Sequence, residues 1–226
     1  MIMLSQRIRY FFKRYLFRLN NGTPYPGIVY TEDDLLQSQD VTPYKPKWKL
    51  NLFLFITTLC TTTLFAPSSG DTISEVLING LPYSLTLMAI LSIHEFGHYF
   101  AARKFGVSAT LPYFIPFPSI IGTMGAVIKT KTPIPHRRAL FYIGIMGPLP
   151  GFFASLIAVL AGVSISEVMP IPLDGGLIIQ LGNSMLFSFI VYVMHGALPA
   201  GYDLFLHPIA WAGWIGFFIT SLNLMH

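Results

Sequence analysis

Charged side chains are scarce in this sequence. Asp, Glu, Lys and Arg together make up 11% of its 226 residues, less than half of the roughly 25% that is usual in soluble globular domains. A single cysteine, Cys60, excludes a framework of internal disulfides. Hydrophobic residues, by contrast, make up 53% of the chain. This balance excludes a soluble domain and indicates a chain that is largely embedded in a lipid bilayer.

The basic residues follow a pattern that is typical of membrane topology. The net charge is +4, but the positive side chains bracket apolar segments and do not cover one face, so no nucleic-acid partner is expected. Residues 1–49 are predicted to form a basic amphipathic segment on the anionic inner leaflet, followed by a polar, proline-rich soluble linker. An unstructured basic tail is the alternative. Three lysines before the first apolar segment place the N-terminal side in the cytoplasm: Lys45, Lys47 and Lys49.

Five apolar segments define a membrane-embedded core that is predicted over residues 50–226. They cover residues 50–66, 81–100, 139–163, 177–194 and 206–225. The predicted fold class is an all-α polytopic membrane protein with about four to five hydrophobic segments. The acidic connections at 67–80 and after residue 163 are expected on the outer side. If both of the last two segments crossed, the chain would end on that side, so one of them is expected to be re-entrant or to lie flat.

The stretch from residue 106 to 138 interrupts this helical pattern. Its five prolines prevent a long helix. Residues 122–130 combine small and β-branched side chains in alternation, which favours a strand or β-hairpin at the membrane surface. An ordinary loop on the inner side, rich in lysine and arginine, is the alternative. The sequence therefore predicts a β-hairpin-like or re-entrant insertion between helical segments.

The motif His94-Glu95-Phe-Gly-His98 lies inside the second apolar segment. On a helix, His94 and His98 are one turn apart and can share one metal ion, while Glu95 reaches round to the open side of that ion. Such a motif arises by chance only about 0.003 times in a chain of this composition. Ionisable side chains at membrane depth are costly and usually functional. The motif predicts a zinc site for peptide hydrolysis, toward the cytoplasmic leaflet because Arg103 and Lys104 follow it.

Several further motifs resemble the site-2 protease family of intramembrane zinc metalloproteases, in its bacterial and plastid branch with an extended N-terminal region. The resemblance covers about residues 80–225 and runs through residues 94–106, 112–116, 122–128, 138–144 and 147–148. It implies a six-helix-type core in which two histidines and a later aspartate bind Zn²⁺ and a glutamate acts as general base. His94 and His98 match these metal ligands, and Glu95 matches the base. Gly122, Thr123, Gly125 and Asn223 match the substrate-binding positions.

The third zinc ligand is missing from the expected place. In the family, the asparagine that Asn223 matches leads into a Leu-Asp-Gly run, which does not follow here. We expect the chain to be a fragment that stops before this aspartate. Asp174, in Leu173-Asp174-Gly175, is the alternative ligand, but its prolines and glycines indicate a turn on the outer face. The remaining histidines are expected at loops and membrane boundaries and not at the metal: His136, His195, His207 and His226.

Together these features predict an intramembrane zinc metalloprotease that hydrolyses peptide bonds in or near transmembrane segments. Its expected partners are transmembrane protein substrates and the lipid bilayer. It is expected to be a multi-pass protein of a bacterial inner membrane or a plastid-type membrane. A catalytically inactive scaffold or chaperone with the same fold is the first alternative, because the third ligand is missing. A metal transporter is the second and ranks lower, since ionisable residues lie almost entirely in loops.

Overall fold

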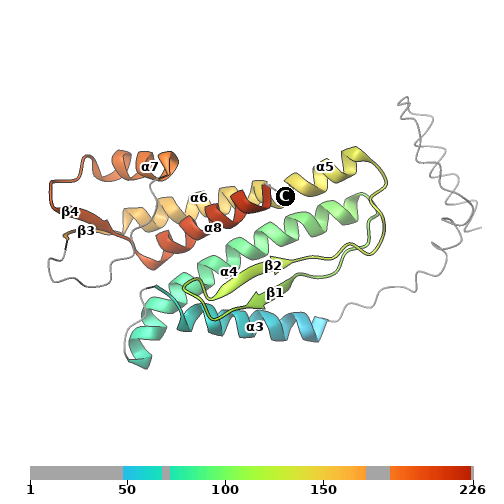
Figure 1. Cartoon of the computed structure of the whole chain (residues 1–226), viewed down its shortest axis with the longest axis horizontal. Helices are drawn as coiled ribbons and strands as arrows, with labels where there is room; N and C mark the ends of the chain where they lie inside the picture. Colours follow the sequence, from blue (N-terminus) through green and yellow to red (C-terminus); the bar gives the residue numbers. More distant parts are fainter. Residues whose placement is uncertain (1–47, 68–71, 172–183, 225–226) are drawn as a thin grey trace, which may run out of the picture. The chain divides into compact units, whose positions relative to one another are not determined.

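A computed structural model describes residues 48–67, 72–171 and 184–224. The predicted basic N-terminal segment, the soluble linker, Asp174 and His226 lie outside these residues. The described part of the chain is mostly helical, as predicted, and contains two short antiparallel sheets in addition. Figure 1 shows the elements in chain order: α3 (Trp48–Leu64), α4 (Ile73–Lys104), β1 (Tyr113–Pro116), β2 (Thr123–Val127), α5 (Arg137–Ile145), α6 (Pro148–Ser164), β3 (Glu167–Pro170), α7 (Met185–His195), β4 (Tyr202–Phe205) and α8 (Pro208–Leu224).

Two helical stretches of the described residues are long and apolar enough to cross a membrane, namely Ile73–Lys104 and Arg137–Ser164. They contain the predicted segments 81–100 and 139–163. The prediction was wrong about residues 73–80, which belong to α4 and not to a loop. The cause is a capping box: the Thr72 hydroxyl accepts from the Glu75 backbone N–H, and the Glu75 carboxylate accepts from the Thr72 N–H, each at 3.3 Å.

Of the predicted segment 177–194, the structure describes residues 184–194, and α7 lies in this part. Helix α7 has 11 residues and is therefore about 16 Å long, far shorter than the ~30 Å of a hydrocarbon core. Helices α3 and α8 have 17 residues each. The number of membrane-crossing segments, four to five, thus stays a prediction. Helix α7 by itself is too short to cross a membrane.

Close helix packing joins α8 to α6 and α4, and small residues permit it. A Cβ on Gly162 would overlap Ala210, and a Cβ on Gly213 would lie 2.8 Å from the Val159 side chain. Gly216 lies against Ser155 of α6 and Ile90 of α4 in the same way. Membrane helices commonly use small residues at such contacts because backbones can then approach closely. In Figure 1 the C-terminal turn of α8 lies near the point where α5 and α6 meet.

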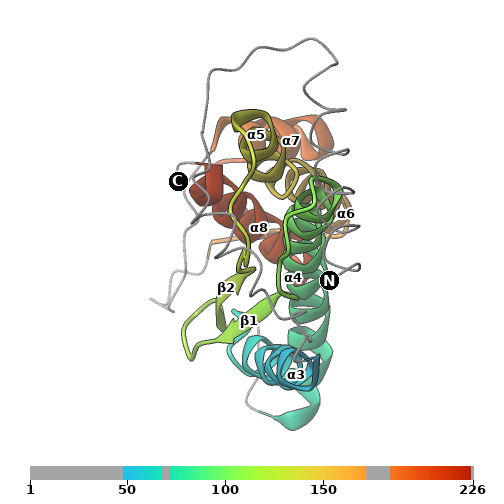
Figure 2. The ribbon, with the colours of Figure 1, turned by 90° about the vertical axis from the view of Figure 1, so that its right-hand side faces the viewer.

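The predicted hairpin is present as β1 and β2, which pair antiparallel with Tyr113 opposite Val127 and Pro116 opposite Thr123. A bulge between Phe114 and Pro116 shifts the register. In both views the hairpin lies between α3 and the remaining helices, with β1 on the α3 side and β2 away from it (Figures 1 and 2). The hairpin interpretation of residues 122–130 is therefore correct for β2, and the predicted insertion between helical segments is present.

A second sheet was not predicted. Strand β3 pairs antiparallel with β4, with Glu167 opposite Phe205 and Pro170 opposite Tyr202. The segment after α6 was expected to be an acidic loop, yet Glu167 begins a strand. Four-residue strands carry too little alternation to be separated from loops by pattern alone. This sheet lies with α7 at the end of the helical layer (Figure 1).

Candidate metal centre

Helix α4 presents His94 and His98 on one face. The Nε2 atoms of the two rings are 3.2 Å apart, and the ring planes are inclined by 67°. Two nitrogens bound to one tetrahedral zinc at 2.0–2.1 Å are about 3.3 Å apart. His94 is 1% exposed, so the pair lies inside the protein. The two Nε2 atoms therefore have the spacing that a shared Zn²⁺ requires.

The hydrogen bonds of both rings leave their Nε2 atoms unprotonated. The Nδ1–H of His98 donates to the backbone carbonyl of Ile143 in α5, at 2.7 Å. This bond fixes the tautomer, since a carbonyl only accepts, and it is the usual outer support of a metal-bound histidine. In His94, Nε2 accepts from Asn223 Nδ2 at 2.9 Å, and the buried Nδ1 has no partner. Each Nε2 thus carries a lone pair that faces its neighbour.

A break between α5 and α6 makes room for the histidines. Pro148 lacks an N–H and ends the continuous helix, so that α6 starts anew with Gly147 as its N-cap. A Cβ on Gly147 would overlap the His98 ring, and a Cβ on Gly151 would lie 2.8 Å from His94 Nδ1. Gly97 of α4 approaches the Met146 backbone in the same region. The small residues that predicted close helix contact are therefore the residues against which the histidine rings lie.

Glu95 lies on a different face of α4. One residue along a helix turns the side chain by about 100°, away from α6. Glu95 is 4% exposed, and its carboxyl group has the backbone of Ile128 as hydrogen-bond partner. Ile128 directly follows β2. Helix α4 thus holds the histidine pair toward α6 and α8 and the carboxyl group toward the hairpin.

The three predicted substrate residues of the hairpin differ in their surroundings. Thr123 is buried, and its hydroxyl donates to Ile115 O at 2.8 Å and accepts from the Gly125 N–H at 3.0 Å. Gly122 lies in the turn with φ +80° against α3, whereas nothing lies within 4 Å of the Cβ position of Gly125. Among the described residues, β2 pairs with β1 alone. The far edge of β2 therefore has no strand partner there.

Asn223 lies where sequence reasoning did not place it. It was expected to contact substrate, but its amide is 2.9 Å from a predicted ligand atom, His94 Nε2. The described residues contain no cluster of three or more His, Cys, Asp or Glu side chains that could hold a metal ion. Asp174 lies outside the described residues, so the identity of the third ligand stays a prediction.

Three other histidines have local structural partners. His136 caps α5 by accepting from the Ala139 N–H, and His207 accepts from the Ile209 N–H. His195 donates to the Val163 carbonyl at the end of α6. That these three histidines do not bind the metal stays a prediction.

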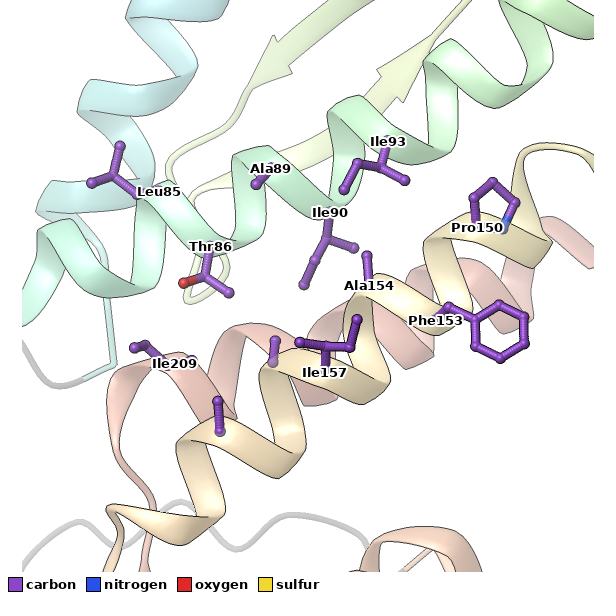
Figure 3. Close-up of a pocket in the computed structure, with 12 residues that line it drawn as sticks. Leu85, Thr86, Ala89, Ile90, Ile93, Pro150, Phe153, Ala154, Ile157 and Ile209 are labelled. Carbon is purple, nitrogen blue, oxygen red and sulfur yellow. The ribbon is translucent and has the colours of Figure 1, made fainter.

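An apolar groove of about 760 Å³ runs between α4 and α6 (Figure 3). Its lining includes Ala89 and Ile93 of α4 and Phe153 and Ile157 of α6, and none of its lining side chains is ionisable. Ile93 and Glu95 are separated by about 200° around the helix axis. The groove therefore does not open toward Glu95. The carboxyl group of Glu95 points instead to the side of α4 that faces the hairpin.

Two histidines one turn apart on a membrane helix, with a buried glutamate beside the first, define a centre of the zinc metallopeptidase class. Residues 82–225 match Peptidase family M50, and the chain belongs to this family. This confirms the resemblance to the site-2 proteases that the motifs indicated.

Curated relatives carry corresponding names. The chain is 32% identical over 154 residues to the probable zinc metalloprotease EGY2, chloroplastic, of Arabidopsis thaliana, covering 66% of this chain and 27% of the relative. It is 29% identical over 157 residues to probable zinc metalloprotease EGY1, chloroplastic, of Oryza sativa subsp. japonica, covering 65% and 26%. The match to probable zinc metallopeptidase EGY3, chloroplastic, of Arabidopsis thaliana is 27% over 188 residues, covering 74% and 32%. The matched part thus spans about a quarter to a third of these relatives. No solved structure matches the chain.

Proposed function

We propose that this chain carries the catalytic centre of a zinc metallopeptidase that hydrolyses peptide bonds in or beside transmembrane segments. The main support for this proposal is the geometry of α4, a helix that is long enough to cross a membrane. It holds two Nε2 atoms 3.2 Å apart and a buried Glu95 on the adjacent face, beside β2. Membership of Peptidase family M50 supports the same chemistry.

His94 and His98 are the residues that would hold zinc, through Nε2. A bound zinc ion supplies Lewis-acid activation of water and of the scissile carbonyl. The Ile143 carbonyl orients the His98 ring for this role, because it binds the opposite ring nitrogen. Asn223 donates to His94 Nε2 in this structure and would have to release that lone pair to a metal.

Glu95 acts as the general base in this proposal. Its carboxylate takes a proton from the attacking water and passes it to the nitrogen of the leaving amine. Burial keeps bulk water away from this carboxyl group, and its contact with the Ile128 backbone directs it to the end of β2. The proton transfer is thereby placed beside the hairpin.

Strand addition to β2 is the proposed mode of substrate binding. The carbonyls of a transmembrane helix are hydrogen-bonded within the helix, so a segment must unwind before it can be cleaved. An unwound segment can pair with a free strand edge, and β2 has one among the described residues. Gly125, with open space at its Cβ position, allows close approach there.

The proposed setting is a multi-pass protein of a plastid-type or bacterial inner membrane, with its N-terminal side in the cytoplasm or its plastid equivalent. Its partners are transmembrane protein substrates and the bilayer itself, and it has no nucleic-acid partner. The apolar spanning helices and the chloroplast relatives support this setting.

Replacement of His94 tests the metal site. His94→Ala is expected to lower zinc stoichiometry of the purified, membrane-reconstituted protein from near one to near zero, because one of two mutually oriented ligands is lost. His136→Ala is the control, since His136 caps α5 and contacts the Phe105 ring, away from the histidine pair. Zinc is measured by elemental analysis after dialysis. Equal zinc in His94→Ala and the wild type would contradict the proposed site.

A further inference from the structure

Helix α3 is in contact with the hairpin, although it lies ahead of the residues that match the family. The family match begins at residue 82, whereas α3 covers Trp48–Leu64. Nothing in the catalytic proposal uses this helix. Its contacts with the hairpin, however, fall at the start of β1, at the middle of β1, and at the turn before β2.

Asn51 holds the start of the hairpin. Its side chain is 7% exposed, and Nδ2 donates to the carbonyls of both Leu111 and Pro112, at 3.1 and 2.7 Å. Both carbonyls belong to the backbone that leads into β1. The side-chain amide of Asn51 therefore fixes two consecutive peptide units of the backbone that leads into β1.

Thr61 holds the turn end. Its hydroxyl lies 2.8 Å from the Gly122 carbonyl, one residue before β2, and 3.0 Å from the Thr58 carbonyl of α3, so its one proton is shared between the two and the Gly122 carbonyl is the nearer acceptor. A Cβ on Gly122 would lie 2.5 Å from Thr62 Cα, so the turn and α3 approach backbone to backbone. From α4, the Tyr83 hydroxyl donates to the neighbouring Ile121 carbonyl at 3.0 Å. The turn is thus held by two helices at once.

Apolar and polar contacts complete a frame of α3, hairpin and α4. Phe55 of α3 packs edge-on against Phe114 of β1, with ring centroids 5.0 Å apart. The hydroxyls of Thr63 and Ser84 are 2.8 Å apart and join α3 to α4. A buried or partly buried contact joins each pair of these three elements. The hairpin therefore cannot shift along α4 without breaking at least one of these contacts.

We propose that α3 is a positioning helix for the substrate strand, with Asn51 and Thr61 as its positioning residues. This inference rests on the proposed role of β2 in substrate binding. The polar contacts that Asn51, Thr61 and Tyr83 make with the hairpin region all end on backbone carbonyls, just before β1 or in the turn before β2. They set where the strand lies relative to Glu95, and they leave the free edge of β2 available.

The test compares Thr61→Val with two matched variants in the full chain reconstituted in lipid nanodiscs. Valine keeps the shape of threonine but cannot donate. Thr61→Ser restores the hydroxyl. Thr57→Val removes the same kind of side chain from the same helix, where the hydroxyl bonds only to the Phe53 carbonyl within α3. Hydrogen–deuterium exchange of the hairpin amides is measured together with zinc content and with KM and kcat for a labelled transmembrane peptide that has a Gly-Pro centre.

Thr61→Val is expected to speed exchange of the β2 amides about 5- to 30-fold, the equilibrium equivalent of one buried hydrogen bond. KM for the peptide is expected to rise by a similar factor with zinc content unchanged. Thr61→Ser and Thr57→Val are expected to behave as the wild type. Asn51→Leu is a second variant, whose effect is expected at the β1 end of the hairpin.

Unchanged exchange in both Thr61→Val and Asn51→Leu would overturn the positioning role of α3. Faster exchange with an unchanged KM would confirm the positioning role and refute the assignment of substrate binding to the hairpin. A loss of zinc in Thr61→Val but not in Thr57→Val would also overturn the inference, because it would show that the bond supports the metal site and not the strand.

Discussion

Glu95→Gln is expected to abolish peptide hydrolysis while leaving zinc content unchanged. Glutamine has nearly the same size and keeps a hydrogen-bonding oxygen, but it cannot take a proton from water. General-base catalysis contributes about 10²- to 10⁴-fold, so kcat is expected to fall by that factor. The measurement is cleavage of the labelled transmembrane peptide in nanodiscs, with zinc determined on the same preparation.

Glu167→Gln is the matched control for this substitution. Glu167 is exposed on β3, in the sheet beside α7, and the same chemical change there is expected to leave kcat unchanged. Cleavage retained in Glu95→Gln would refute the general-base assignment. Loss of zinc together with cleavage would show instead that Glu95 supports the metal site, in which case the proton transfer would need another group.

Gly147→Ala is expected to weaken zinc binding about 10- to 100-fold, the range for changes in the support of a metal ligand. Gly147 has φ −86° and ψ −61°, which alanine adopts freely, so the backbone is not the obstacle. The added Cβ overlaps the His98 ring. Either the ring turns away from His94 or α6 moves outward, and overpacking of this kind costs about 1–3 kcal/mol. Zinc titration and thermal unfolding measure the two effects.

Gly144→Ala provides the comparison. Gly144 lies one turn earlier in α5, and nothing lies within 4 Å of its Cβ position. Alanine there is expected to keep zinc affinity and to raise stability slightly, by up to about 1 kcal/mol, since alanine favours helix over glycine. If both variants bound zinc as the wild type does, the close contact between Gly147 and His98 would not support the metal site.

The sequence is most informative about the site where the residues concerned lie close together along the chain. His94 and His98 are one turn apart in any helix, so their meeting follows from the sequence alone. The capping box of Thr72 and Glu75 is equally local and is readable in the sequence, although residues 67–80 are predicted as a connection on the outer side. Local signals therefore suffice for the histidine pair, whereas the helix start at Ile73 is missed.

Contacts between distant residues could not be predicted in the same way. Asn223 is separated from His94 by 129 positions, and only the packing of α8 on α6 and α4 brings them together. The small residues after Gly147 predicted a close contact but not that histidine rings would lie against it. Strands β3 and β4 pair although they are far apart in the sequence, and each strand is too short to show a pattern.

The way α3 holds the hairpin has a consequence for how substrate preference can change. Its bonds end on backbone carbonyls, which every residue type supplies. Exposed side chains of β2, such as Met124 and Val127, take no part in them. Substitutions of Met124 or Val127 can therefore change which peptide is preferred without weakening the hydrogen bonds between α3 and the hairpin. Evolution or protein engineering can vary substrate specificity at these two positions while the hairpin stays in place.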